Sequence, residues 1–167
     1  MYSIKKTVFA VAIIIAVTSC SRKKAVEEST AATTADSLVA YIERTPCFGR
    51  CPNYSIRLYQ SGYAVYEGYN NVPNIGRYFT RISGQEVKSI GEKAKALHFF
   101  ELNDSYRNPH LTDFPTVFIE VNYDHLHKKI VHYDADPPKA LLEMEDFIDA
   151  VFKDRKWQLH PVQTIKE

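Results

Sequence analysis

Apolar and polar residues alternate with a period of two over much of the chain, which predicts β-strands. The pattern is clearest in residues 53–60, where Tyr54, Ile56 and Leu58 alternate with more polar neighbours, as in a strand with one buried face. Similar or mostly apolar runs predict five further strands, in residues 38–45, 63–67, 77–82, 115–123 and 126–133. The connections between most neighbouring runs are short, so we expect the strands to pair antiparallel.

Two other segments repeat apolar residues every three or four positions, which predicts amphipathic helices. The first begins at Ser83, because Ser83 and Glu86 have the spacing of a capping box. The second begins at residues 136–138, since proline is tolerated in a first turn. Their buried residues are Val87, Ile90, Ala94 and Leu97 in the first and Leu141, Met144, Ile148, Val151 and Phe152 in the second. The resulting order, β-β-β-β-α-β-β-α, predicts an α+β fold, with an antiparallel sheet of about six strands and both helices on one face.

The same alternation places aromatic residues on the face of the sheet without helices. We assign Tyr59 and Tyr66 to the face opposite Ile56 and Leu58. Exposed aromatic residues there could mark a ligand or partner surface. The alternative is cross-strand aromatic pairing that stabilises the sheet.

The connection between the first two strands, Pro46 to Pro52, contains two cysteines. If the strands pair around it, Cys47 lies opposite Cys51, with Cβ atoms about 4.5–5.5 Å apart. A disulfide needs about 3.8 Å, so a small adjustment closes it. The flanking prolines lack an N–H group and interrupt the strand pairing there. We predict a structural disulfide between Cys47 and Cys51, with a redox-active dithiol or a metal-binding pair as the alternatives.

The first residues have the features of an export signal. A short positive region, Met1 to Lys6, precedes an apolar run from Thr7 to Val17. This run is shorter than the roughly 20 residues that span a bilayer, and it fits the apolar region of a secretory signal. Residues 17–20, Val-Thr-Ser-Cys, resemble a bacterial lipobox. By that resemblance Cys20 is acylated and residues 1–19 are removed, whereas an ordinary signal peptide is the alternative.

The composition changes again between Cys20 and the first strand. Residues 21–37 are rich in Ala, Thr, Ser and Glu, and such a segment buries too little apolar surface to fold. We expect residues 20–37 to form a lipidated cysteine with a flexible tether, residues 38–159 a single α+β domain and residues 160–167 a tail. Ser21, in place of Asp, resembles the sorting signal for the outer membrane, so the expected partner is the membrane of the bacterial envelope, reached through Cys20.

Charge and motifs narrow the range of functions. A formal net charge of +1 argues against a general nucleic-acid surface. The chain has no Gly-rich phosphate loop, no Gly-x-Ser-x-Gly and no His-Glu-x-x-His. We therefore predict no cofactor and assign no catalytic residue.

The histidines and several aspartates are further candidate site residues. His125 and His127 lie two apart and could chelate a metal on a strand, yet they belong to the expected hairpin tip at Asp124-His125, where polar residues are ordinary. The other histidines read as surface or loop residues: His98, His110, His132 and His160. Turn and cap roles suit Asp113, Asp134 and Asp136.

Four segments of the chain together carry a resemblance to a known protein family. They are Pro46-Cys47-Phe48-Gly49-Arg50-Cys51-Pro52-Asn53-Tyr54, Ser61-Gly62, Tyr66-Glu67-Gly68 and Asp113-Phe114-Pro115. Together they resemble the bacterial family known as domain of unknown function 6438, over nearly all of the expected domain. The resemblance implies an exported or lipid-anchored protein and no established activity. We predict a lipid-anchored envelope protein with a binding or structural role; the alternative is a thiol-redox or metal-binding protein that uses Cys47 and Cys51.

Overall fold

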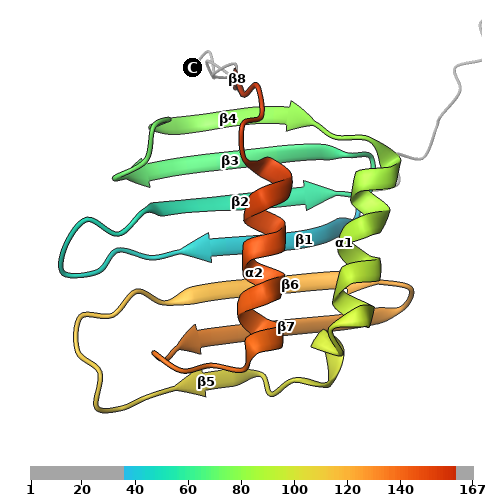
Figure 1. The fold of residues 1–167 in the computed structure, drawn as a ribbon. Helices are drawn as coiled ribbons and strands as arrows, with labels where there is room; N and C mark the ends of the chain where they lie inside the picture. Colours follow the sequence, from blue (N-terminus) through green and yellow to red (C-terminus); the bar gives the residue numbers. More distant parts are fainter. Residues whose placement is uncertain (1–35, 161–167) are drawn as a thin grey trace, which may run out of the picture. The chain divides into compact units, whose positions relative to one another are not determined.

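The computed structural model describes residues 36–160, in which eight strands form one sheet and two α-helices pack on it (Figure 1). The strands are β1 (Leu38–Arg44), β2 (Asn53–Tyr59), β3 (Tyr63–Asn70), β4 (Gly76–Arg81), β5 (Ser105–Arg107), β6 (Val117–Tyr123), β7 (Leu126–Tyr133) and β8 (Gln158–Leu159). The helices are α1 (Gly84–Ala96), the short η1 (Phe99–Glu101) and α2 (Lys139–Phe152). The predictions for Cys20, the signal peptide and the tail beyond residue 160 lie outside the described residues.

The strands lie in the order β5-β7-β6-β1-β2-β3-β4-β8 and are antiparallel except for the parallel pair of β5 and β7. The six predicted strands correspond to β1 to β4, β6 and β7, and the α+β class is confirmed. The predicted count and order missed β5 and β8, which add one short strand to each edge of the sheet. Strands of three and two residues carry no readable period; they exist because the edges of β7 and β4 offer unpaired backbone groups.

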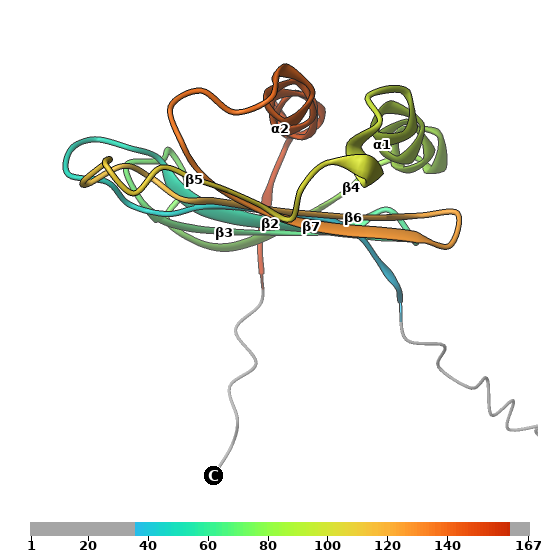
Figure 2. The ribbon, with the colours of Figure 1, turned by 90° about the horizontal axis from the view of Figure 1, so that it is seen from below.

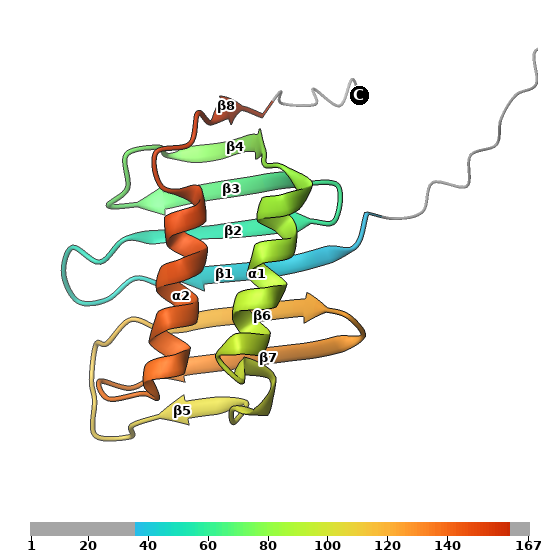
Figure 3. The ribbon, with the colours of Figure 1, turned by 45° about the vertical axis from the view of Figure 1, so that its right-hand side comes forward.

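Both helices cover one face of the sheet and run side by side across the strands (Figures 2 and 3). α1 begins with the predicted capping box, in which the Ser83 hydroxyl accepts from the Glu86 N–H and the Glu86 carboxylate accepts from the Ser83 N–H. The core between helices and sheet contains the predicted apolar stripes, and its fully buried members include Ile42, Leu58, Ile90, Ile119, Ile130, Leu141, Met144 and Ile148. Burying one such side chain stabilises the fold by about 1.5–3 kcal/mol.

Tyr66 does not lie on the face that we predicted. It pairs with Ile56 on β2 and Tyr78 on β4, and residues paired across strands share a face. Its side chain therefore points towards the helices and is 8% exposed. Alternation within one strand sets which residues share a face, but only the register against β2 sets which face that is. Tyr59 alternates with the fully buried Leu58 and stacks on Tyr63, so its predicted position is correct.

The opposite face of the sheet carries aromatic and charged side chains that contact one another. None of the described helices covers this face (Figure 2). The Arg57 guanidinium lies 4.9 Å from the centre of the Tyr41 ring and 3.0 Å from the Glu67 carboxylate. Tyr63 lies 5.8 Å from Phe79 between ring centres. The aromatic residues of this face thus contact one another across strands, as in the pairing alternative, and no described helix covers them.

Candidate functional site

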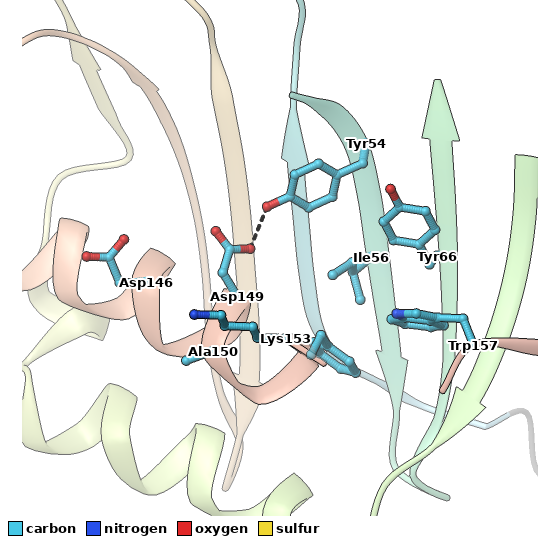
Figure 4. Close-up of a pocket in the computed structure, with 9 residues that line it drawn as sticks. Tyr54, Ile56, Tyr66, Asp146, Asp149, Ala150, Lys153 and Trp157 are labelled. Carbon is cyan, nitrogen blue, oxygen red and sulfur yellow. Dashed lines mark hydrogen bonds between the residues drawn. The ribbon is translucent and has the colours of Figure 1, made fainter. Parts of the chain in front are cut away.

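A cavity of about 440 Å³ lies between the C-terminal half of α2 and strands β2 and β3 (Figure 4). Its lining is mainly aromatic and apolar on the sheet side and charged on the helix side. The lining residues are Tyr54, Ile56, Tyr66, Asp146, Asp149, Ala150, Phe152, Lys153 and Trp157. A preformed, largely apolar cavity with a few polar groups is the usual form of a ligand site.

The aromatic wall is a chain of rings in contact. Tyr54 stacks on Tyr66 at 5.8 Å, and Tyr66 lies 5.3 Å from Trp157 at an angle of 41°. Gly68 makes this arrangement possible, because a Cβ atom there would lie 1.9 Å from the Asn74 carbonyl oxygen and 2.8 Å from the Tyr66 hydroxyl. Of the Tyr66-Glu67-Gly68 segment, Tyr66 thus lines the cavity and Gly68 leaves room for its ring.

Two hydrogen-bond donors of this wall have no acceptor within residues 36–160: the Tyr66 hydroxyl and the Trp157 indole N–H both line the cavity without a partner. In Figure 4 the indole nitrogen lies at the end of the Trp157 ring that is turned towards Ile56. Burial raises the pKa of Tyr66, so its hydroxyl stays protonated and able to donate. Both groups are available to a ligand.

A partly buried ionic network under α2 fixes the polar side of the cavity. Arg44, at the end of β1, donates to the Asp149 carboxylate at 2.7 and 3.1 Å and to Glu145 at 3.3 Å. The Tyr54 hydroxyl donates to the other oxygen of Asp149 at 2.6 Å (Figure 4). Burial and then the charge of Asp149 raise the pKa of Tyr54, so it acts as a donor and not as a base. Burial lowers the pKa of Arg44, but the charge of Asp149 and the other partners of Arg44 outweigh this effect. The net pKa is raised, so the guanidinium stays charged.

The network continues to His132, which we predicted to be a surface or loop residue. That prediction is wrong, because His132 is 6% exposed and contacts the 2% exposed Glu145 at 2.8 Å through Nδ1. Its Nε2 lies 2.9 Å from the Asp134 carbonyl oxygen. Burial lowers the pKa of His132, but the hydrogen bond and charge of Glu145 outweigh it, so the pKa is raised. Alternation with Ile130 on β7 was a signal in the sequence that could have placed His132 inside.

A second hollow, of about 250 Å³, lies beside the N-terminal half of α2. Its lining includes Arg44, Glu145 and His132 of the network, as well as Phe114 and Pro115. Asp146 lines both cavities, and we call the two together the α2 groove. Asp146 is exposed and makes no hydrogen bond or ion pair with any described residue.

The Cys loop, residues 45–52, closes the end of the sheet beside this groove. The structure contains the predicted disulfide between Cys47 and Cys51, with Cα atoms 5.6 Å apart. Pairing of β1 with β2 stops at Arg44 and Tyr54, before the two prolines, as expected. The disulfide therefore links the two strand ends whose last residues, Arg44 and Tyr54, hold Asp149.

The tip of the Cys loop is exposed, but its stem is held by neighbouring loops. Phe48 is 90% exposed, while its backbone N–H donates to the Asp113 carbonyl at 3.3 Å. The Asn71 side chain donates to the Cys51 carbonyl at 3.2 Å. The loop, the Asp113-Phe114-Pro115 segment and Tyr54 therefore meet at one end of the sheet, although they are far apart in the sequence.

The other histidines and aspartates considered in the sequence lie in turns or pair with neighbouring side chains. Asp124 and His125 both have positive φ, 51° and 64°, which suits the predicted tight hairpin turn. His127 contacts Glu120 at 3.2 Å. The Asp134 carboxylate accepts from the Asp136 N–H, a turn contact. Among residues 36–160, no three His, Cys, Asp or Glu side chains are grouped to hold a metal ion.

None of the helices in the described part of the chain is long and apolar enough to cross a membrane.

A family model described as "Domain of unknown function (DUF6438)" matches residues 39–152, more than half of the 167-residue chain. The chain belongs to this family. A search of curated proteins found no match. The region matched by the DUF6438 model contains Arg44, Tyr54, His132, Glu145 and Asp149, and so the whole ionic network, whereas Trp157 lies just beyond it.

Proposed function

We propose that this DUF6438 protein is a lipid-anchored binding module of the bacterial cell envelope, and that the α2 groove is its ligand site. The observation that carries the binding role is the preformed aromatic cavity, where the Tyr66 hydroxyl and the Trp157 indole N–H have no acceptor among residues 36–160. Asp149, Glu145, Arg44 and His132 are paired with one another. Such pairing favours a fixed binding surface over a site that moves protons.

The lipobox at residues 17–20 supports anchoring through Cys20, with residues 21–37 as the tether and the outer membrane as the location. β1 begins at Leu38 and runs towards the Cys loop, so the tether joins the domain at the opposite end of this strand (Figure 1). Two or three acyl chains anchor a protein firmly, since each buried CH₂ contributes about 0.8 kcal/mol. Mass spectrometry of the mature N-terminus tests this: we expect an acylated Cys20, and an unmodified N-terminus beyond Cys20 would contradict it.

The exposed tip of the Cys loop favours one second candidate, a thiol-redox function of Cys47 and Cys51. These cysteines lie between two strands, and not at the helix N-terminus that lowers thiolate pKa in thioredoxin-like sites. Titration of the exported protein against glutathione buffers separates the candidates. A disulfide that resists reduction supports the binding module, and a readily reduced pair of high potential supports redox chemistry.

The binding role itself is tested with a fragment screen read by NMR at the Trp157 indole N–H. Ala150→Phe places a ring in the cavity from the exposed side of α2, and Ala96→Phe makes the same change at an exposed alanine of α1. We expect small heterocyclic fragments to shift the Trp157 resonance in the parent and in Ala96→Phe but not in Ala150→Phe. Equal responses of all three proteins, or no response to any fragment, would contradict a ligand site here.

A further inference from the structure

We propose that His132, on β7, is a pH-sensitive switch beside α2. When protonated, its ring binds both α2 and the β7–α2 connection, residues 134–138. When neutral, it releases the connection. The switch needs no ligand and is independent of the binding role proposed above. Two observations carry it: the partners of the two ring nitrogens and the balance of charges around the ring.

Both ring nitrogens of His132 face groups that accept hydrogen bonds. Nε2 lies 2.9 Å from the backbone carbonyl oxygen of Asp134, and a carbonyl group has no proton to donate. Nδ1 lies 2.8 Å from one oxygen of the Glu145 carboxylate, whose other oxygen accepts from Arg44 at 3.3 Å. A neutral imidazole has a single N–H group, so it can satisfy only one of these two acceptors. The geometry therefore requires the imidazolium form, with a proton on each nitrogen.

The charges around the ring balance only when His132 is protonated. Two carboxylates, those of Glu145 and Asp149, face one guanidinium, that of Arg44. A second cation makes the network neutral, and an unbalanced charge is costly where side chains are buried. Burial lowers the pKa of His132, and the charge of Arg44 does so too, but the hydrogen bond and charge of Glu145 outweigh both and raise the pKa above its ordinary 6.5.

The other groups that face His132 supply no positive charge. Tyr106 pairs with it on β5, and Asp134 and Asp146 line the same hollow. Neither a tyrosine nor a carboxyl group is positive in any protonation state. Val117, the paired residue on β6, is apolar. No group among these can replace the imidazolium when its proton leaves.

Loss of the proton breaks the contact with Asp134. A neutral His132 must give up one of its two partners. A hydrogen bond to a carboxylate is charge-assisted and roughly twice as strong as one to a neutral carbonyl. The tautomer with its proton on Nδ1 therefore keeps Glu145, and it turns the lone pair of Nε2 towards the Asp134 carbonyl oxygen. Two acceptors then face each other, so the connection moves away from the ring.

The movement should be confined to the first part of the connection. Within residues 36–160, the bond from His132 is the only hydrogen bond between residues 134–138 and a strand. Ala135 and Asp136 are exposed, whereas Pro137 is buried and stays in place. Asp134, Ala135 and Pro137 line the hollow of about 250 Å³ beside α2. Deprotonation therefore changes the shape of this part of the α2 groove.

A pH titration of the protein by ¹⁵N NMR tests the proposal, because the shifts of Nδ1 and Nε2 distinguish the imidazolium from each neutral tautomer. We expect both nitrogens of His132 to carry protons at about pH 5.5. Above the pKa, Nδ1 alone should stay protonated. The backbone amide signals of Ala135 and Asp136 should shift with the same midpoint as the ring.

Three variants separate the switch from a general effect of pH. Glu145→Gln keeps an oxygen that can accept but removes the charge, so the midpoints of the ring and of the Ala135 amide should fall together. His132→Gln removes the titrating group, and the pH response of this amide should be lost. His127→Gln, at an exposed histidine of the same strand, should keep the response of the parent.

Several outcomes would overturn the proposal. One is a neutral His132 ring at about pH 5.5, since one of its two acceptors would then be unpaired. Others are a ring titration without any change at Ala135 and Asp136, and a pH response of these amides that persists in His132→Gln. A neutral form with its proton on Nε2 would also contradict the switch, because His132 would then release α2 and keep the connection.

Discussion

The two helices cover the same face of one sheet, but they differ in their capping, their terminal charges and the residues that they bury. α1 has a capping box, acidic Glu86 in its first turn, and Lys93 and Lys95 in its last turn. α2 begins after Pro138 without a side-chain cap, and it buries Glu145 within its apolar stripe. The ends of α1 follow the rules for a stable helix, whereas α2 lacks a side-chain cap and buries a carboxylate.

The difference indicates what each helix is for. A buried carboxylate is costly unless it is paired, and replacing a buried ionic network by apolar residues is often neutral or stabilising. Stability alone therefore does not account for Glu145 and its partners Arg44 and His132. The network does hold Asp149 and Tyr54 in place at the edge of the α2 groove. This arrangement fits the proposed function, in which α2 forms one side of the ligand site.

The largest expected effect comes from removing the centre of the network. Arg44→Met leaves Glu145 and Asp149 without their guanidinium partner, which should lower the free energy of unfolding by about 3–5 kcal/mol. Arg57→Met breaks a more exposed pair with Glu67 on the open face and should cost about 1 kcal/mol or less. Urea unfolding measures both. A loss in Arg44→Met no greater than in Arg57→Met would show that α2 does not depend on this network.

The disulfide ranks second. Changing both Cys47 and Cys51 to Ser should lower stability by about 2 kcal/mol, because the closed ring is short. The melting temperature should fall by several degrees, since about 1 kcal/mol shifts a domain of this size by a few degrees. The domain should stay folded, and amide exchange should quicken at Phe48, Gly49 and Arg50. Free thiols in the exported parent, together with unchanged stability of the variant, would contradict a structural disulfide.

A change within α1 tests the close packing of that helix. Gly91→Ala places a Cβ atom 2.0 Å from the Tyr123 ring, so the ring must move. Overpacking of this kind typically costs about 1–3 kcal/mol, and the better helix propensity of alanine offsets about 1 kcal/mol of it. At Gly84 of the same helix, an added Cβ atom would meet no other part of the described chain within 4 Å beyond its own helix backbone, so Gly84→Ala should not destabilise the protein. Thermal denaturation compares the two, and equal melting temperatures would mean that α1 is not tightly packed at Gly91.

The smallest expected effect is a pH dependence of stability that comes from the contact between His132 on β7 and Glu145 on α2. Contact with Glu145 raises the pKa of His132 above its ordinary 6.5, against the opposing effects of burial and of the nearby Arg44. A raised folded pKa stabilises the protein fully below the unfolded pKa, and this contribution is lost as pH rises through the folded pKa. Unfolding free energy should therefore fall as pH rises above about 6.5 in the parent, and less so in His132→Gln. The opposite slope in the difference between the two proteins would mean that His132 is not stabilised in its charged form.

Local pattern was enough to predict most of the framework. The capping box at Ser83 and Glu86, the apolar stripes of both helices, the hairpin turn at Asp124 and His125 and the pairing of Cys47 with Cys51 all depend on residues close in the sequence. Their spacing relates directly to the period of a helix, a strand or a tight turn. For this reason the α+β class and the disulfide could be predicted without tertiary information.

The site could not be predicted in this way. Arg44 and Asp149 are 105 positions apart, and only the packing of α2 across β1 and β2 brings them together. The predicted face of Tyr66 was wrong because the register between β2 and β3, and not the alternation within β3, decides which way its side chain points. A polar residue such as Glu145 or His132 looks like a surface residue until its partner is known. Burial of a charge depends on a second charge from elsewhere in the chain, and only the folded structure supplies it.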